Sequence, residues 1–328
     1  MRRIGLAVVL ALSLVLAPLA SQAQQATRVP RIGYLVLSPL VDPPSAERQA
    51  FLTGLRELGY VIGQNIAIEY RSAESKVDRL AQAARELVSL PVNIVVVFGS
   101  TEARAAQQAT STVPIVMIAI GDPVRAGFAV SLARPGGNMT GNSYLSPDLI
   151  GKRLEILKEC VPSVARVAFL WNPDNNSNLV FLEELIIAVP ALGLQLISVP
   201  VRNADEFEGA FAAMMRRMPN ALVLTGDALH RRYVRQILDF AAKDHLPVVS
   251  QEKEIVAAGA LLSYGADLSD LLRQGALYVH KILQGSRPAD LPIEQPTHFK
   301  LGINLKTARA LGLEVPPTLL ARADEVIE

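Results

Sequence analysis

Small polar residues stand directly after many of the short apolar runs in this sequence, and they are the residues best suited to bind a small ligand. Ser100 and Thr101 can donate hydroxyl and nearby backbone N–H groups to an anionic group, or they can simply cap a helix. Asp122 can accept from an ammonium or hydroxyl group of a ligand, or it can cap the next turn. The predicted ligand-binding residues are Ser38, Gly99, Ser100, Thr101, Asp122, Asn175, Asn176, Asp227, Gln251 and Tyr264.

Signs of catalytic chemistry are missing from the same sequence. It has no G-x-S-x-G elbow, no G-x-x-x-x-G-K-[ST] loop and no G-x-G-x-x-G fingerprint. No pair of histidines has the spacing of metal ligands. Several histidines and paired glutamates are expected on solvated helix faces: His230, His245, His280, Glu183, Glu184, Glu252 and Glu254. We therefore predict no catalytic residue, no metal and no cofactor.

Composition excludes several classes of protein. The 328 residues carry 32 Lys+Arg and 31 Asp+Glu, so the net charge is +1 and there is no basic surplus for nucleic acid. Half of the residues are hydrophobic and only 19% are charged, which excludes disorder. Cys160 is the single cysteine, so an internal disulfide framework is excluded, and we expect this thiol to be buried on a helix.

The N-terminal residues have the pattern of a secretory signal peptide. A basic Met1–Arg3 precedes the uncharged apolar run Ile4–Leu16, which is too short to span a bilayer. Pro18 follows, and small residues before Ala23 fit cleavage after that residue. No cysteine follows the run to carry a lipid. We expect 1–23 to be removed and the mature protein to be periplasmic.

Strands and helices alternate along the rest of the chain. Runs such as Ile94–Phe98 are apolar on both faces, as in the centre of a parallel sheet covered by helices. The predicted strands are 32–37, 66–70, 94–98, 115–120, 139–143, 167–171, 194–199, 221–225, 247–250 and 260–264. The predicted helices are 45–58, 77–90, 102–110, one that Ser146 caps, 179–192, 204–217, 229–243, 268–282 and 306–311. This alternation predicts α/β doubly wound sheets of four or five strands each.

A turn-rich break at 134–138 divides the chain into two such layers, and the residues after Tyr264 are too few for a third. We expect them to cross back to both layers. Lobe 1 is then 24–143 plus 267–296, and lobe 2 is 144–266 plus 297–328. Two lobes joined by crossover hinge segments make a clamshell that closes on a ligand beyond the carboxyl ends of its strands.

Short sequence blocks support this architecture in a different way. They are Ile32–Tyr34, Gly54–Tyr60, Gly121–Val124, Arg134–Gly141, Asn172–Asn175, Ser263–Gly265, Ile303–Ala308 and Ala321–Ile327. In this order they resemble the ABC transporter substrate-binding protein family that includes tryptophan/tyrosine-type binding proteins. The resemblance implies the type I periplasmic-binding-protein clamshell.

The resemblance also implies a ligand class, since amino acids, aromatic ones included, are ligands of such proteins. The Ser100 and Thr101 N–H groups would bind the carboxylate, and Asp122 or Asp227 the ammonium. Glu102 follows that loop and would repel the carboxylate unless it points away along its helix.

Two functions remain open on the sequence. The first is a solute receptor that delivers a small ligand to an ABC permease in the inner membrane. The second is a periplasmic ligand-sensing partner of a membrane receptor or sensor kinase with the same clamshell. An exported hydrolase is disfavoured because the nucleophile motif is missing. We expect a monomer that binds no nucleic acid.

Overall fold

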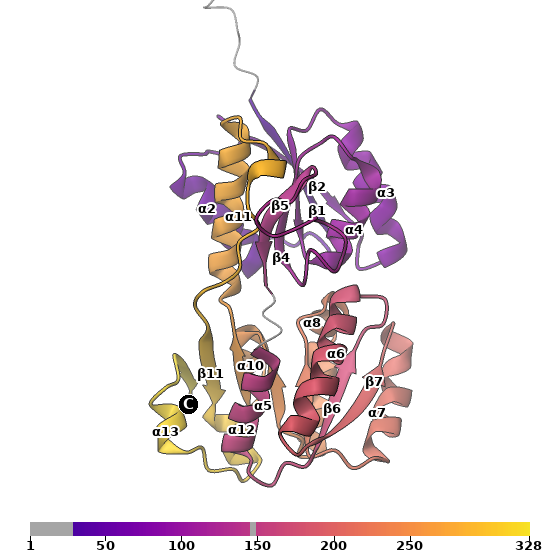
Figure 1. Cartoon of the computed structure of the whole chain (residues 1–328), viewed down its shortest axis with the longest axis vertical. Coiled ribbons are helices and arrows are strands. Elements are labelled where there is room, and N and C mark those ends of the chain that lie inside the picture. Colours follow the sequence, from indigo (N-terminus) through magenta and orange to yellow (C-terminus); the bar gives the residue numbers. More distant parts are fainter. Residues whose placement is uncertain (1–28, 145–148) are drawn as a thin grey trace, which may run out of the picture.

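The chain forms two α/β lobes, one above the other in Figure 1. The structure is a computed structural model, and it describes residues 29–144 and 149–328. The predicted signal peptide and the Ser146 cap lie outside the described residues. Among the described residues, no helix is both long and apolar enough to cross a bilayer.

Lobe 1 is built on a five-stranded sheet with the order β2-β1-β3-β4-β5, in which every neighbouring pair is parallel. Its elements are β1 (Arg31–Val36), α2 (Ala46–Glu57), β2 (Ala67–Ser72), α3 (Val77–Ser89), β3 (Ile94–Phe98), α4 (Ser100–Ala109), β4 (Ile115–Ile120), β5 (Met139–Ser143) and α11 (Leu268–Leu283).

Alternation along β3 shows why this sheet needs helices on both faces. Val95 and Val97 pack in a core with α3 and α4, whereas Ile94 and Val96 pack in a second core with α2 and α11. All four side chains are at most 1% exposed. Successive strand residues point to opposite faces, so an all-apolar strand requires two layers of cover.

Lobe 2 is built on a seven-stranded sheet with the order β12-β11-β10-β9-β8-β6-β7. Strand β11 is antiparallel to β10, and the other pairs are parallel. Its strands are β6 (Arg166–Trp171), β7 (Gln195–Pro200), β8 (Ala221–Leu224), β9 (Val248–Ser250), β10 (Leu262–Gly265), β11 (Lys300–Asn304) and β12 (Glu325–Ile327). Its helices are α5 (Leu149–Cys160), α6 (Asn176–Ala191), α7 (Phe207–Met215), α8 (Ala228–Arg232), α9 (Val234–Lys243), α10 (Lys253–Ala257), α12 (Leu305–Ala310) and α13 (Pro317–Leu320).

Helices cover both faces of this sheet too. One core joins the sheet to α5 and α6, and the other joins it to α7, α9 and α10. Cys160, the last residue of α5, is buried in the first core, as predicted. The doubly wound, two-lobed fold class expected from the sequence is confirmed, with one antiparallel pairing in the second sheet.

The chain crosses between the lobes three times, as Figure 1 shows. It leaves lobe 1 after β5, returns from β10 into α11, and leaves again through the segment that precedes β11. Helix α11 packs so closely on α2 that a Cβ on Gly54 would lie 2.9 Å from the Cα of Arg273. Near the crossings, the Ser143 N–H donates to the Glu294 carbonyl at 2.8 Å. These contacts bind the returning segment to lobe 1.

Some local predictions were wrong. The expected helix 204–217 is a 3-10 turn, Ala204–Glu206, followed by α7, and the expected helix 229–243 is divided into α8 and α9. The sequence analysis also missed α10, α13 and β12 and did not count β11 as a strand, so the second sheet exceeds the expected four or five strands. Strand β12 is three residues long, which is too short for a visible alternation.

Candidate functional site

The carboxyl ends of the strands in the two sheets face each other and are in contact. The Ser100 Oγ, after β3, lies 2.7 Å from the Ser177 Oγ on α6. The guanidinium carbon of Arg231 on α8 lies 5.1 Å from the centre of the Phe98 ring. These contacts join lobe 1 to lobe 2, so the cleft between the lobes is narrow here.

Gly121 shows how little room the cleft leaves at this edge. A Cβ built on Gly121 would lie 2.3 Å from the Oγ and 2.6 Å from the Cβ of Ser177. Both distances are far inside van der Waals contact. Only a residue without a side chain lets the two lobes approach this closely.

The predicted residues of lobe 1 occupy this edge in different ways. Gly99 has a φ of 97°, a conformation that favours glycine, and immediately precedes α4. The Ser100 Oγ accepts from the Gly121 N–H at 3.3 Å. Asp122 caps its own turn, since its Oδ1 accepts from the N–H groups of Val124 and Arg125. Ser38 is exposed.

Glu102, the residue expected to disturb a bound carboxylate, is turned inward. It is 5% exposed, and its Oε1 accepts from the Leu37 N–H at 3.2 Å. Burial raises the pKa of this carboxyl to about 7. Among the described residues, Glu102 has no ion-pair partner. It is therefore only partly ionised at neutral pH, and it carries less negative charge there than an ordinary glutamate.

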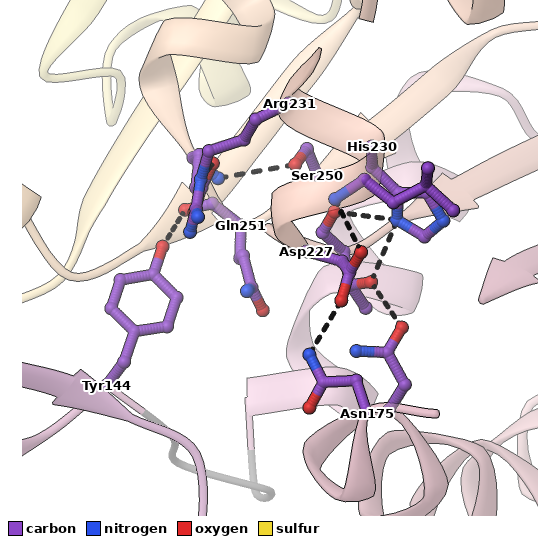
Figure 2. A network of polar contacts seen from close by, with 11 residues as sticks. Tyr144, Asn175, Asp227, His230, Arg231, Ser250 and Gln251 are labelled. Atoms are coloured by element: carbon purple, nitrogen blue, oxygen red, sulfur yellow. Dashed lines mark hydrogen bonds and ion pairs between the residues drawn. The ribbon is translucent and has the colours of Figure 1, made fainter. Parts of the chain in front are cut away.

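Asp227 is the centre of a polar network in lobe 2, seen in Figure 2. It caps α8 by accepting from the Leu229 N–H at 2.8 Å, and it accepts from the Asn175 Nδ2 at 2.6 Å. The Asn172 Nδ2 lies 3.5 Å away. Asn175 in turn caps α6 through the Ser177 N–H. The network ties together the loops after β6 and β8, so most of the acceptor capacity of Asp227 is already used.

A cavity of about 200 Å³ lies between the lobes and brings four of the predicted residues together: Ser100, Thr101, Asn175 and Asn176. Helices α3 and α4 form its wall in lobe 1, with Arg104 and Phe128. The guanidinium carbon of Arg104 lies 4.5 Å from the centre of the Phe128 ring. The cavity thus combines small polar groups with a cation and a ring.

One of the remaining predicted residues, Gln251, lies at a second, smaller cavity. Gln251 lines it, together with Ser250, Thr225 and Arg153. The Tyr144 hydroxyl holds the Gln251 carbonyl at 2.9 Å, as Figure 2 shows. The Tyr264 carbonyl accepts from the Arg153 Nε at 2.6 Å, while the Tyr264 ring packs 6.1 Å from that of Phe299.

The sequence analysis missed Arg153, which is not among the predicted ligand-binding residues. The signal was present in the sequence, since Arg153 falls three residues after Ile150 on the apolar face of α5. A charged residue on the buried face of a helix needs a partner or a function.

Glu252 is buried, which corrects its expected place on a solvated face. Its side chain is 1% exposed and accepts three contacts from Arg231, the shortest at 2.7 Å from Nη2. Burial alone would lower the pKa of Arg231, but the adjacent carboxylate raises it above its usual value. A Cβ on Gly226 would lie 1.8 Å from the Glu252 Oε1, so the loop after β8 leaves space only for glycine.

His230 is also buried and not on a solvated face. Its Nδ1 lies 3.2 Å from the Thr225 carbonyl and 3.3 Å from the Thr225 Oγ1, and burial lowers its pKa. The short helix α8 starts beside β8, and this turns its third residue toward the sheet. His245 is exposed as expected, and His280 is half-buried with its Nδ1 3.0 Å from the Tyr60 hydroxyl.

The described part of the chain holds no cluster of three or more His, Cys, Asp or Glu that could bind a metal ion.

Comparisons with known proteins identify relatives along almost the whole chain. A family model described as "ABC transporter substrate binding protein" matches residues 37–327. A tyrosine-binding protein of Clostridioides difficile is 26% identical over 281 residues, which cover 85% of this chain and 80% of that protein.

Solved structures are similar over the same length. The structure of an ABC domain in complex with L-Trp from Streptococcus pneumoniae has a TM-score of 0.85 and is 26% identical, covering 91% of this chain and 99% of its own. A conserved domain protein from Vibrio cholerae also has a TM-score of 0.85 and is 28% identical, covering 91% of this chain and all of its own.

Proposed function

The chain belongs to the ABC transporter substrate-binding protein family, and we propose that it captures an aromatic amino acid in the cleft between its lobes and delivers it to an ABC permease in the inner membrane. The observation that carries the proposal is the similarity over 91% of the chain to a structure that contains L-Trp. The tyrosine-binding relative supports the same ligand class. The chain acts by binding and not by catalysis.

The proposed site consists of the ten residues predicted from the sequence. Ser100, Thr101, Asn175 and Asn176 share the larger cavity, which supports a direct role for them. The site lies between a lobe 1 of 24–143 plus 267–296 and a lobe 2 of 144–266 plus 297–328. We propose these boundaries because the sheets and crossings of the fold agree with them.

A calorimetric titration of the mature protein with L-tryptophan, L-tyrosine and L-phenylalanine tests the ligand class, with L-leucine and D-tryptophan as controls. An aromatic ligand at about 100 times its Kd should stabilise the fold by about 2.7 kcal/mol, which a thermal unfolding scan detects. If none of the aromatic amino acids binds, or if L-leucine binds as tightly as they do, this ligand class is wrong.

A Gly121→Ala variant tests whether ligand capture requires closure of the cleft. The added Cβ collides with Ser177 only when the lobes meet. We expect about tenfold weaker binding and a larger radius of gyration with ligand present, at unchanged free energy of unfolding. Gly137→Ala is the matched control, because nothing lies within 4 Å of a Cβ there. Unchanged affinity of Gly121→Ala would show that ligand binding does not need this contact.

The proposed periplasmic location and monomeric state have direct tests. N-terminal sequencing of the protein from a periplasmic extract should start after Ala23, and light scattering should give the mass of one chain. Loss of labelled amino-acid uptake in cells that lack the protein would support delivery to a permease. Normal uptake together with a lost transcriptional response would instead favour a sensing partner.

A further inference from the structure

We propose that Arg153 and Gln251 form a subsite, at the cleft edge of lobe 2, for the carboxylate and the ammonium of an α-amino acid. This inference rests on the proposed function and goes further, since it assigns the two charges of the ligand to two residues. Among the described residues, the guanidinium of Arg153 has hydrogen-bond donors without an acceptor, and the Gln251 Oε1 is an acceptor without a donor. A carboxylate suits the first and an ammonium suits the second.

Among the described residues, Arg153 is a buried cation without an anion. Arg153 is 6% exposed, and its Nε donates to the Tyr264 carbonyl. Its Nη1 and Nη2 donate to none of the described residues, and no described carboxylate forms an ion pair with it. Burial lowers the pKa of Arg153 to about 10, and only Tyr144 and Tyr264 act against this effect. A guanidinium stays protonated at neutral pH even so.

Gln251 is a buried acceptor that no described residue supplies with a donor. It is 6% exposed, and its Oε1 is buried without a hydrogen-bond partner among the described residues. The backbone of Gln251 is fixed by the Tyr144 hydroxyl, and the close-up in Figure 2 shows its side chain extending away from Tyr144 and Arg231. A buried amide oxygen left unpaired costs about 1–3 kcal/mol, so a ligand donor there would be favourable.

Both residues line the same small cavity under α5 and α6. Its other lining residues are mostly apolar: Ile150, Leu154, Phe181, Leu185, Val223, Leu224, Thr225 and Ser250. The guanidinium carbon of Arg153 lies 5.8 Å from the centre of the Phe181 ring. Thr225 and Ser250 follow or end strands β8 and β9, which places the cavity at the edge of the sheet that faces lobe 1.

The size of the cavity limits what it holds. Its volume is about 10 Å³, room for one water-sized group. One oxygen of the ligand carboxylate is thus the part that fits inside the cavity, and the α-carbon, the ammonium and the remainder of the ligand lie at its mouth toward the cleft. A carboxylate matches the two free donors at the end of a guanidinium, and an ammonium on the adjacent carbon can donate to the Gln251 Oε1.

The test compares three indole ligands on the wild type and on Arg153→Gln by calorimetry: L-tryptophan, tryptamine, which lacks the carboxylate, and indole-3-propionate, which lacks the ammonium. We expect wild type to bind tryptamine about 100-fold more weakly than L-tryptophan. Arg153→Gln should bind L-tryptophan about 100-fold more weakly and should no longer distinguish it from tryptamine. Gln251→Leu should lose about tenfold for L-tryptophan while leaving indole-3-propionate unchanged.

Arg166→Gln is the matched control. The Arg166 Nε also donates to a backbone carbonyl of lobe 2, but Arg166 is the first residue of β6 and so lies at the end of the strand away from the cleft. Its affinity for L-tryptophan should equal that of wild type. If Arg153 had only a structural role, Arg153→Gln would still bind L-tryptophan more tightly than tryptamine.

The outcomes separate this inference from the proposed function. If wild type binds L-tryptophan but Arg153→Gln binds it equally well, or still rejects tryptamine, the subsite is wrong and the proposed function stands. If wild type binds no aromatic amino acid but binds indole-3-propionate or benzoate in a way that Arg153→Gln abolishes, the carboxylate assignment stands and the proposed function fails. If no carboxylate in the panel binds, both are overturned.

Discussion

Two arginines at the cleft edge of lobe 2 are in opposite electrostatic situations. Arg231 is held by the two carboxylate oxygens of Glu252 and lies over the Phe98 ring of the other lobe. In the described part of the chain, Arg153 has the Tyr264 carbonyl and the Phe181 ring beside its guanidinium but no carboxylate. A buried cation is stable when it is paired, so the first arginine is explained within the fold, while the second is completed only by something that the fold does not contain.

This contrast separates charged residues that have partners within the fold from charged residues that are left to pair with a ligand. Asp227 resembles Arg231, because Asn175 and the Leu229 N–H occupy it. Glu102 resembles Arg153 in one respect, because it too is buried without an ion-pair partner among the described residues, although it accepts from the Leu37 N–H. A charge in the cleft is informative only after its partners are known.

The strongest way to break the contrast is to make Arg231 resemble Arg153. Glu252→Gln removes the carboxylate and leaves Arg231 partly buried without its anion. We expect a loss of about 3 kcal/mol in the free energy of unfolding, measured by urea denaturation. Asp290→Asn, in the exposed pair with Arg287, should change it by less than about 0.5 kcal/mol. If the two variants were equally stable, the ion pair of Arg231 with Glu252 would contribute no more to the free energy of unfolding than an exposed pair does.

A second prediction concerns the unpaired acid. Burial raises the folded-state pKa of Glu102 to about 7, so the folded protein keeps a proton that the unfolded chain releases near its ordinary value of 4.5. This stabilising contribution is complete below pH 4.5 and is lost as pH rises to 7. Glu102→Gln mimics the protonated form and should be more stable than wild type by about 2–3 kcal/mol at pH 8, with no difference near pH 4.

Urea unfolding of wild type and Glu102→Gln across pH 4–8 measures this difference. A constant difference between the two proteins would show that Glu102 titrates normally and that its burial is relieved by other contacts.

A third prediction sharpens the contrast from the side of Arg153. Without ligand, Arg153→Met should leave the free energy of unfolding unchanged or raise it by about 1 kcal/mol, because it replaces an unpaired buried cation by an apolar side chain. Arg231→Met should instead lower it by about 2 kcal/mol, because Glu252 stays buried without a partner. Thermal unfolding of the ligand-free proteins checks both. A clear loss for Arg153→Met would mean that the fold itself depends on the guanidinium.

The smallest effect is expected at an exposed pair. Arg125 and Glu183 connect the lobes, but their side chains are 45% and 55% exposed. Arg125→Ala should change the free energy of unfolding and the free energy of ligand binding by about 0.5 kcal/mol or less, and the difference should vanish at 1 M salt. A larger effect that persists in salt would show that this exposed pair stabilises the protein as the buried Arg231–Glu252 pair does.

The fold was readable from the sequence because its signal is local. The four apolar residues 94–97 predict a strand covered on both faces, and each side chain is indeed packed against a helix on one face or the other. The division between α8 and α9 at Tyr233 was not readable, because no proline or glycine marks it. Nor was β12, which depends on pairing with β11 and not on its own pattern.

The site was only partly readable because a charge is defined by partners far away in the sequence. Glu252 stands among charged neighbours and looked solvated, yet Arg231, 21 residues away, pairs with it in the interior. Asp122 turned out to cap its own turn, one of its two anticipated roles. The positions of Ser100, Thr101, Asn175 and Asn176 around one cavity follow from strand ends meeting at one edge, which the alternation of elements already implied.

Helix α11 has a consequence for the order in which the protein can be completed. Its residues Leu272 and Val279 pack in the same core as Phe51 of α2, although the chain reaches them only after the strands β6–β10. A chain emerging from the ribosome N-terminus first must therefore leave one sheet face only partly covered, by α2, until residue 283 is made, and β11 comes later still. The lobe that starts first is thus completed only shortly before the second, so both halves mature almost together and the nascent chain has a long exposure to chaperones.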